Sequence, residues 1–324
     1  MPTLESDRIA PFFTANSSVR FSYVTDFASV YAELSPLMSP LWDNIKGFAN
    51  SSFTTSLAGA FAGAIAAQRI AEKGKFREDL VKEFQNTNAA ISLATATACL
   101  ALALKKQHVK ALKTSYDDDL KNFEAHKEKV LGRKIAANTP FEISPNLLYL
   151  QEVSPPTATI QDVVLSRLST VGRTISAVTA LTDAVKNLNG ALSKRNELLN
   201  SFKNNQFPEG ATFHHMYLGL PYRETHTNQE YGGSVEAIYL YTNDIIFFSI
   251  KLCEDLRDHG ETLKKRYRSR LRGSPPRIST VDFEKPRQDG LVPKDEDYVD
   301  WLSGFITVQE TIPKWWQRVN PRFD

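Results

Sequence analysis

The residues best suited to chemistry in this sequence are gathered between positions 213 and 230. This stretch holds His214, His215 and His226, together with Glu224 and Glu230. Imidazole and carboxylate groups can bind zinc or iron, and a histidine beside an acid can act as a general base. The candidate catalytic residues are therefore His214, His215, His226 and Glu224, and the candidate metal ligands are His214, His215, His226 and Glu230. No HExxH or cysteine–histidine finger spacing occurs here, so the alternative is a polar loop with ordinary hydrogen bonds.

Positive charge is concentrated in a second stretch, residues 264–272, which we call the basic cluster. Its basic members are Lys264, Lys265, Arg266, Arg268, Arg270 and Arg272. Such side chains bind the phosphates of nucleic acids or anionic lipid headgroups. They also suit the carboxyl end of a helix, where the dipole favours cations. The sequence thus predicts an anion-binding surface for nucleic acid or anionic lipid, and the alternative is a solvated helix end balanced by nearby acids.

Other chemical signals are sparse. The net charge of +2 indicates no partner by itself. No glycine-rich phosphate loop and no GxSxG nucleophile elbow is present, and we predict no cofactor. Asp244 lies in an apolar stretch and, if buried, needs a partner such as Arg167, Arg173 or Arg195. The two cysteines lie far apart in the sequence, which favours reduced, buried thiols and a cytoplasmic location.

Long helices must position these residues. Residues 56–131 contain no proline, and their only glycines are Gly59, Gly63 and Gly74. Apolar and small residues recur in steps of mostly three and four, the period of a helical bundle seam. The seam from 84 to 116 consists of Phe84, Thr87, Ile91, Ala94, Ala98, Ala101, Lys105, Val109, Leu112 and Tyr116. We therefore expect one very long helix, or two nearly collinear ones, with Gly132 as its C-cap.

Two further helices are expected at about 159–202 and 234–271. The first repeats apolar residues near every 3.5 positions, and its simplest packing is an antiparallel hairpin with residues 84–131. The predicted fold is mainly α: an elongated, coiled-coil-like antiparallel helical hairpin with a third long helix and irregular N- and C-terminal arms. The predicted divisions are an N-terminal arm (1–55), a long helical bundle (56–272) and a tail packed on the bundle (273–324).

Two uncharged stretches raise the question of a membrane. One lies between Lys46 and Arg69, and the other between Glu83 and Lys105. Each is about as long as a membrane span, and the first contains a GxxxG pattern at Gly59 and Gly63. The first stretch contains many polar residues, and the second is rich in alanine and threonine. Basic residues follow both stretches, so a hairpin of two spans would place basic residues on both sides of the membrane, which the positive-inside rule disfavours. Membrane anchoring near 47–68 is therefore an alternative rather than the leading interpretation.

Extended helical hairpins present surfaces more readily than catalytic clefts. The leading hypothesis is a non-enzymatic structural or interaction protein that self-associates through its long helices, with Gly59 and Gly63 at the contact, as a homo-oligomer or with a protein partner. The first alternative is a membrane-associated helical protein anchored near 47–68. The second is a metal-dependent hydrolase or nuclease that uses the loop from His214 to Glu230.

Overall fold

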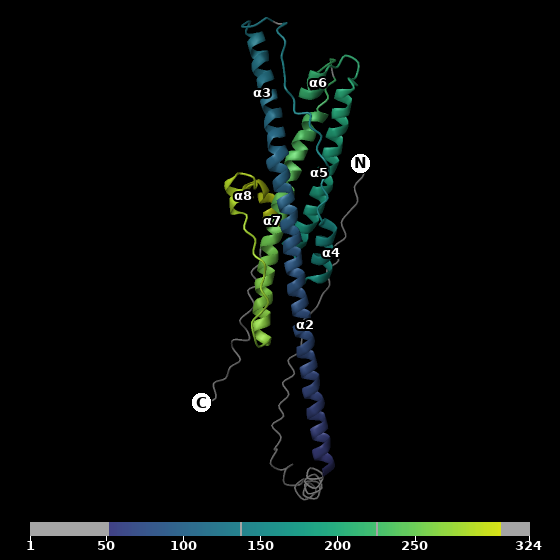
Figure 1. Ribbon diagram of the computed structural model, residues 1–324, viewed down its shortest axis with the longest axis vertical. Helices are drawn as coiled ribbons and strands as arrows, with labels where there is room; N and C mark the ends of the chain where they lie inside the picture. Colours follow the sequence, from purple (N-terminus) through teal and green to yellow (C-terminus); the bar gives the residue numbers. More distant parts are fainter. Residues whose placement is uncertain (1–51, 137, 225, 306–324) are drawn as a thin grey trace, which may run out of the picture. The chain divides into compact units, whose positions relative to one another are not determined.

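A computed structural model of the chain describes residues 52–136, 138–224 and 226–305, with side chains from residue 59 onward (Figure 1). Most of the expected N-terminal arm and the tail beyond residue 305 lie outside the described residues. The chain forms two compact units, residues 1–72 and 73–324. The predicted mainly α fold is confirmed, because 72% of the described residues are helical, the long helices pack together, and the described residues contain no strand.

The first helical stretch is continuous, as expected. It consists of α2 (Ser52–Leu104), the π-helical turn η1 (Lys105–Val109) and α3 (Lys110–Leu131), with Gly132 as the C-cap. Alanine favours a helix, and proline is absent. Three threonines in the middle of α2 donate their hydroxyls back to carbonyls four residues earlier: Thr87 to Glu83 at 2.8 Å, Thr95 to Ile91 at 2.7 Å and Thr97 to Leu93 at 3.0 Å. A buried hydroxyl is thereby paired without a partner from another helix.

The predicted seam of this helix is buried at every position from Phe84 to Tyr116. Around Ala101, Lys105 and Val109 the seam takes two successive steps of four residues. On an ordinary α-helix these steps would carry the stripe roughly 80° around the axis. The wider π-helical turn at 105–109 offsets this drift, because it takes more residues per turn. Lys105 and Val109 thus both stay on the buried side.

The remaining helices differ from expectation mainly at their ends. They are α4 (Thr157–Arg167), α5 (Arg173–Lys203), α6 (Phe213–Leu218), α7 (Glu230–Arg270), α8 (Glu284–Gln288), the 3₁₀ turn η2 (Asp295–Tyr298) and α9 (Val299–Ser303). The helix expected at 159–202 is interrupted at 168–172, where Gly172 adopts a φ of +65°. Val171 belongs to the apolar repeat from which that helix was expected, but because of the interruption it is 81% exposed.

The long helices pair differently from the predicted hairpin. Residues 139–156 are not helical and carry the chain back along the bundle, so α5 runs in the same direction as α2 and α3 (Figure 1). α7 runs in the opposite direction and packs extensively against α5. Phe202 at the end of α5 meets Tyr231 at the start of α7, with ring centroids 5.4 Å apart. The antiparallel hairpin is therefore α5–α7, and the expected antiparallel pairing of the first and second helices is wrong.

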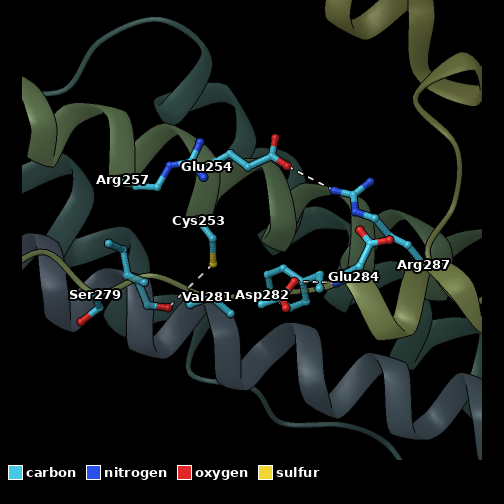
Figure 2. Close-up of a pocket in the computed structure, with 10 residues that line it drawn as sticks. Cys253, Glu254, Arg257, Ser279, Val281, Asp282, Glu284 and Arg287 are labelled. Carbon is cyan, nitrogen blue, oxygen red and sulfur yellow. Dashed lines mark hydrogen bonds and ion pairs between the residues drawn. The ribbon is translucent and has the colours of Figure 1, made fainter.

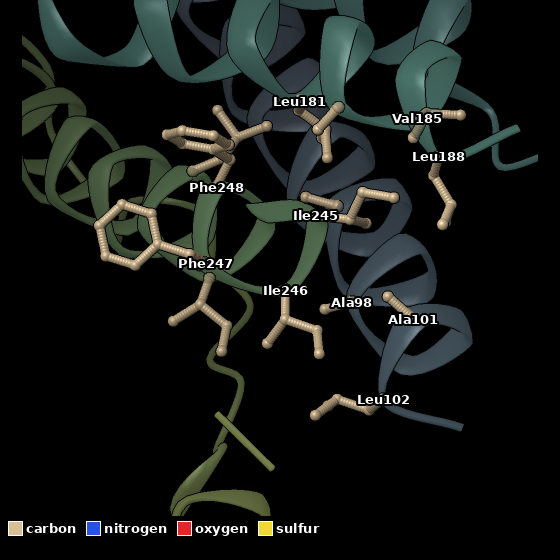
Figure 3. Close-up of a cluster of buried hydrophobic side chains, with 14 of the residues drawn as sticks. Ala98, Ala101, Leu102, Leu181, Val185, Leu188, Ile245, Ile246, Phe247 and Phe248 are labelled. Carbon is tan, nitrogen blue, oxygen red and sulfur yellow. The ribbon is translucent and has the colours of Figure 1, made fainter. Parts of the chain in front are cut away.

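One core joins the three long helices (Figure 3). Ala98 and Ala101 of α2 lie among Leu181, Val185 and Leu188 of α5 and the apolar run 245–248 of α7. The small alanine side chains leave space for the larger side chains of the facing helices.

The described part of the tail packs against this core. Tyr298 stacks on Phe247 with ring centroids 3.7 Å apart, and its hydroxyl donates to Asp244 Oδ1 at 2.7 Å. Asp244 therefore finds its partner in the tail rather than in an arginine of the second helix. Burial raises the pKa of the Asp244 carboxyl, against a smaller opposing effect of the Tyr298 hydrogen bond.

Two glycines of α7 test how closely the tail packs. A Cβ at Gly260 would lie 2.6 Å from two side-chain carbons of Ile278, whereas a Cβ at Gly233 would meet nothing within 4 Å. We expect Gly260→Ala to destabilise the protein by about 1–3 kcal/mol through overpacking. Gly233→Ala should stabilise it by up to about 1 kcal/mol through helix propensity. Urea denaturation of both variants checks this, and equal effects would contradict the tight contact with the tail.

Candidate functional sites

The histidines of the loop 213–230 lie in separate hydrogen-bonded positions. Thr212 and His215 form a capping box at the start of α6, in which His215 Nδ1 accepts from the Thr212 N–H at 3.0 Å. His214 Nε2 lies 3.0 Å from the carbonyl oxygen of Phe141. His215 and His226 flank the ring of Tyr222, at centroid distances of 6.3 Å and 6.2 Å. The loop thus brings His215 and His226 to one aromatic ring, while His214 is turned toward the segment 139–156.

The two glutamates of this loop differ in their surroundings. Glu224 is exposed, and Glu230 lies 3.4 Å from Lys194 Nζ. Within the described ranges, no group of three or more His, Cys, Asp or Glu side chains is arranged to hold a metal ion. The catalytic and metal-binding assignments on this loop stay predictions that the observed geometry does not support.

The basic cluster spans the last turns of α7 and the residues after it. Lys264 pairs with Glu261 at 2.7 Å, and the guanidinium of Arg270 lies 5.1 Å from the centre of the Phe76 ring. Lys265, Arg266, Arg268 and Arg272 are exposed. Lys264 and Arg268 line an open groove of about 430 Å³ together with Arg277. The geometry therefore brings part of the predicted anion-binding set to one groove, along with an arginine that the sequence interpretation did not include.

Glu83 joins three segments in a contact that the sequence interpretation missed. Its Oε1 accepts from the backbone N–H of Ser169 at 3.0 Å and from the Ser169 hydroxyl, and it lies 3.1 Å from His259 Nε2. Burial alone would raise the pKa of Glu83, but the hydrogen bonds from His259 and Ser169 outweigh it and lower the pKa to about 2. The carboxylate is thus held ionised where α2, the 168–172 linker and α7 meet.

This contact resembles a serine–histidine–acid set only in its residue types. In a nucleophilic triad the imidazole lies beside the serine hydroxyl and the acid orients the imidazole. Here Ser169 and His259 both meet the same oxygen of Glu83. The arrangement links segments of the fold and does not activate the hydroxyl.

A small pocket between α7 and the residues around α8 contains a cysteine and several charges (Figure 2). Its volume is about 120 Å³. Glu254 and Arg287 form an ion pair of 3.2 Å across it. Burial raises the pKa of the Cys253 thiol to about 11. A thiol that stays protonated at neutral pH is a poor nucleophile, so this pocket lacks the activated cysteine of a catalytic site.

A row of asparagines on α5 holds the segment 139–156, and we call it the asparagine row. Asn189 donates to the carbonyl of Val153 at 2.8 Å and accepts from the Val153 N–H at 2.9 Å. Asn196 does the same with Leu150, at 2.7 Å and 3.3 Å. Each amide side chain thus pairs a backbone N–H and C=O of this extended segment, as a neighbouring β-strand would do in a sheet. The signal in the sequence is the seven-residue spacing of the two asparagines, which places them on one helix face.

By length and composition, one described helix, Gly59–Leu131, is apolar enough to cross a membrane, although 44% of its most apolar window is buried inside the fold.

Comparison with family models, curated proteins and solved structures found no match. The fold and sites define a mainly α protein whose long helices share one core.

Proposed function

We propose that this chain is a non-enzymatic helical interaction protein that associates with copies of itself through the first part of α2. The observation that supports this is the exposure of large apolar side chains there: Phe61 is 63% exposed, Ile65 51% and Ile70 73%. Residues 59–75 are exposed throughout. A helix stretch with several large apolar side chains in water is typical of an interaction surface.

The apolar residues occupy two sides of this helix. At about 100° per residue, Gly59, Gly63 and Ile70 lie on one side, and Phe61 and Ile65 lie roughly 200° around the axis. A Cβ at Gly59 or Gly63 would meet no atom within 4 Å, so a second helix has room to approach closely. Because one partner helix covers only one stripe, the proposed assembly has each α2 in contact with two other copies.

Charge and length favour another copy of the chain over lipid as the occupant. The uninterrupted apolar run is 57–67, about half of the roughly 20 residues that a membrane span requires. Charged residues follow at once with Arg69, Glu72 and Lys73, and Gln68 donates to Glu72 at 2.8 Å. Such residues at the end of an apolar run can set the register of a bundle.

Light scattering of the full chain during size-exclusion chromatography tests this proposal. The expected mass is three or more times that of one chain at micromolar concentration. Ile65→Glu should weaken association at least about tenfold, because it places a charge in the apolar contact. Ala71→Glu is the matched control, because it adds the same charge at an exposed position between the two apolar sides of the helix, and it should have a much smaller effect. A native chain that elutes as a monomer would overturn the proposal.

Membrane association through 47–68 is the second candidate function, favoured by the exposed apolar side chains of the same helix. Residues 47–51 lie outside the described residues. Flotation with vesicles of neutral and anionic lipid distinguishes it from self-association. Flotation that resists carbonate and is lost in Ile65→Glu would support membrane anchoring, and a chain that stays with the soluble fraction would argue against it.

A further inference from the structure

We propose that a cavity between η1, the segment 139–156 and α5 binds a small oxyanion, either a phosphate or a short carboxylate. The cavity has a volume of about 120 Å³. Its polar lining consists of Gln107, His108, Asn146 and Arg195, and the remaining lining is apolar. It lies apart from the groove at the basic cluster, with which it shares no lining residue.

The first argument is the charge of Arg195, which is 1% exposed and is the largest fully buried side chain of the described residues. Its two Nη atoms donate to the carbonyls of Leu148 and Asn146, both at 2.8 Å. The ring of Tyr231 lies 5.8 Å from the guanidinium carbon. Among the described ion pairs, none gives Arg195 a carboxylate. A buried charge without a counter-charge is costly, so an anion beside it is stabilised.

The second argument is the set of donors around the cavity. Gln107, His108 and Asn146 can each donate a hydrogen bond, and no acidic residue belongs to the lining. The Oδ1 of Asn146 accepts from the backbone N–H of Leu148 at 3.1 Å, which fixes the amide and leaves its NH₂ group to donate. Three side chains that can donate, in a cavity that is also lined by a buried guanidinium, match the several acceptor positions of a carboxylate or a phosphate.

The third argument is the π-helical turn. Gln107 and His108 belong to η1, where the helix widens by one residue. Single π-helical turns inside α-helices often occur at functional sites, because the extra residue changes the direction of the side chains that follow. Here the turn keeps Lys105 and Val109 in the core and places Gln107 and His108 at the cavity.

The test is a titration of the full chain with sodium phosphate, and separately with sodium acetate, at constant ionic strength, observed through the imidazole resonances of His108. At least one of the two anions should shift these resonances saturably. Tighter binding of phosphate would indicate a tetrahedral ligand, and tighter binding of acetate would indicate a planar carboxylate. Asn146→Asp keeps an oxygen for the Leu148 N–H but puts a carboxylate in the cavity. It should weaken binding at least about tenfold, or 1.4 kcal/mol. Gln107→Glu serves the same purpose if Asn146→Asp does not fold.

The control is Arg268→Glu, which removes a positive charge from the groove at the basic cluster. It should leave the anion-dependent shift of the His108 resonances unchanged. Three results would overturn the proposal: no saturable shift with either anion, full binding by the folded Asn146→Asp or Gln107→Glu variant, or loss of binding in Arg268→Glu. The last result would place the anion at the basic cluster instead. The proposed function is tested by the oligomeric state of the chain. The anion titration does not depend on that state, so the two proposals can fail separately.

Discussion

Replacing Glu83 with glutamine is expected to lower the free energy of unfolding by about 3 kcal/mol at pH 7. The folded pKa of Glu83 is about 2, against 4.5 for an ordinary glutamate. Each pKa unit of difference between the folded and unfolded states corresponds to about 1.4 kcal/mol. Glutamine retains an acceptor for Ser169 and His259, but it loses the charge that strengthens both contacts.

The same shift predicts an acid dependence. Because the folded pKa is depressed, the unfolded chain binds more protons between pH 4.5 and 2. The contribution of Glu83 is therefore complete above pH 4.5 and is lost as the pH falls toward 2. Urea denaturation at several pH values should show a shallower acid decline for Glu83→Gln than for the native chain. Glu78→Gln, on the exposed face of the same helix, is the control and should change the decline little. An unchanged decline in Glu83→Gln would contradict the assignment.

Removing the asparagine row should release the segment 139–156. The double variant Asn189→Ala/Asn196→Ala deletes four hydrogen bonds to the backbone of Val153 and Leu150. Each bond contributes about 0.5–1.5 kcal/mol, and partly buried groups left unpaired add to the cost. We expect a loss of about 3–4 kcal/mol in the free energy of unfolding, unless part of the segment detaches without global unfolding.

Hydrogen exchange separates these two outcomes. The amides of Leu150 and Val153 should exchange much faster in the double variant, whereas those in the middle of α5 should keep their protection if the segment detaches alone. Asn187→Ala is the matched control, because Asn187 is exposed on the same helix. If the Leu150 and Val153 amides stay protected in the double variant, the asparagines do not hold the segment.

The sequence by itself determined the helices and the buried face of the first one. Steps of three and four residues from Phe84 to Tyr116 predicted a set of positions that are all buried, because an apolar stripe with a helical period faces the core. Ala90, Thr97 and Leu102 are also buried there, although they do not belong to that stripe. Gly132 was identified as the C-cap for a similarly local reason. Such signals depend on neighbours within a few turns of the same helix.

Only the tertiary structure decided how the helices pair and where the polar contacts form. An apolar seam fits a parallel or an antiparallel partner equally well, and the direction of α5 depends on the extended return of residues 139–156. Glu83, Ser169 and His259 come from three distant parts of the chain. No periodic pattern links them, because each occupies a position that is ordinary within its own segment. The buried charge of Arg195 is equally invisible in the sequence, since its partners are backbone carbonyls, which every residue carries.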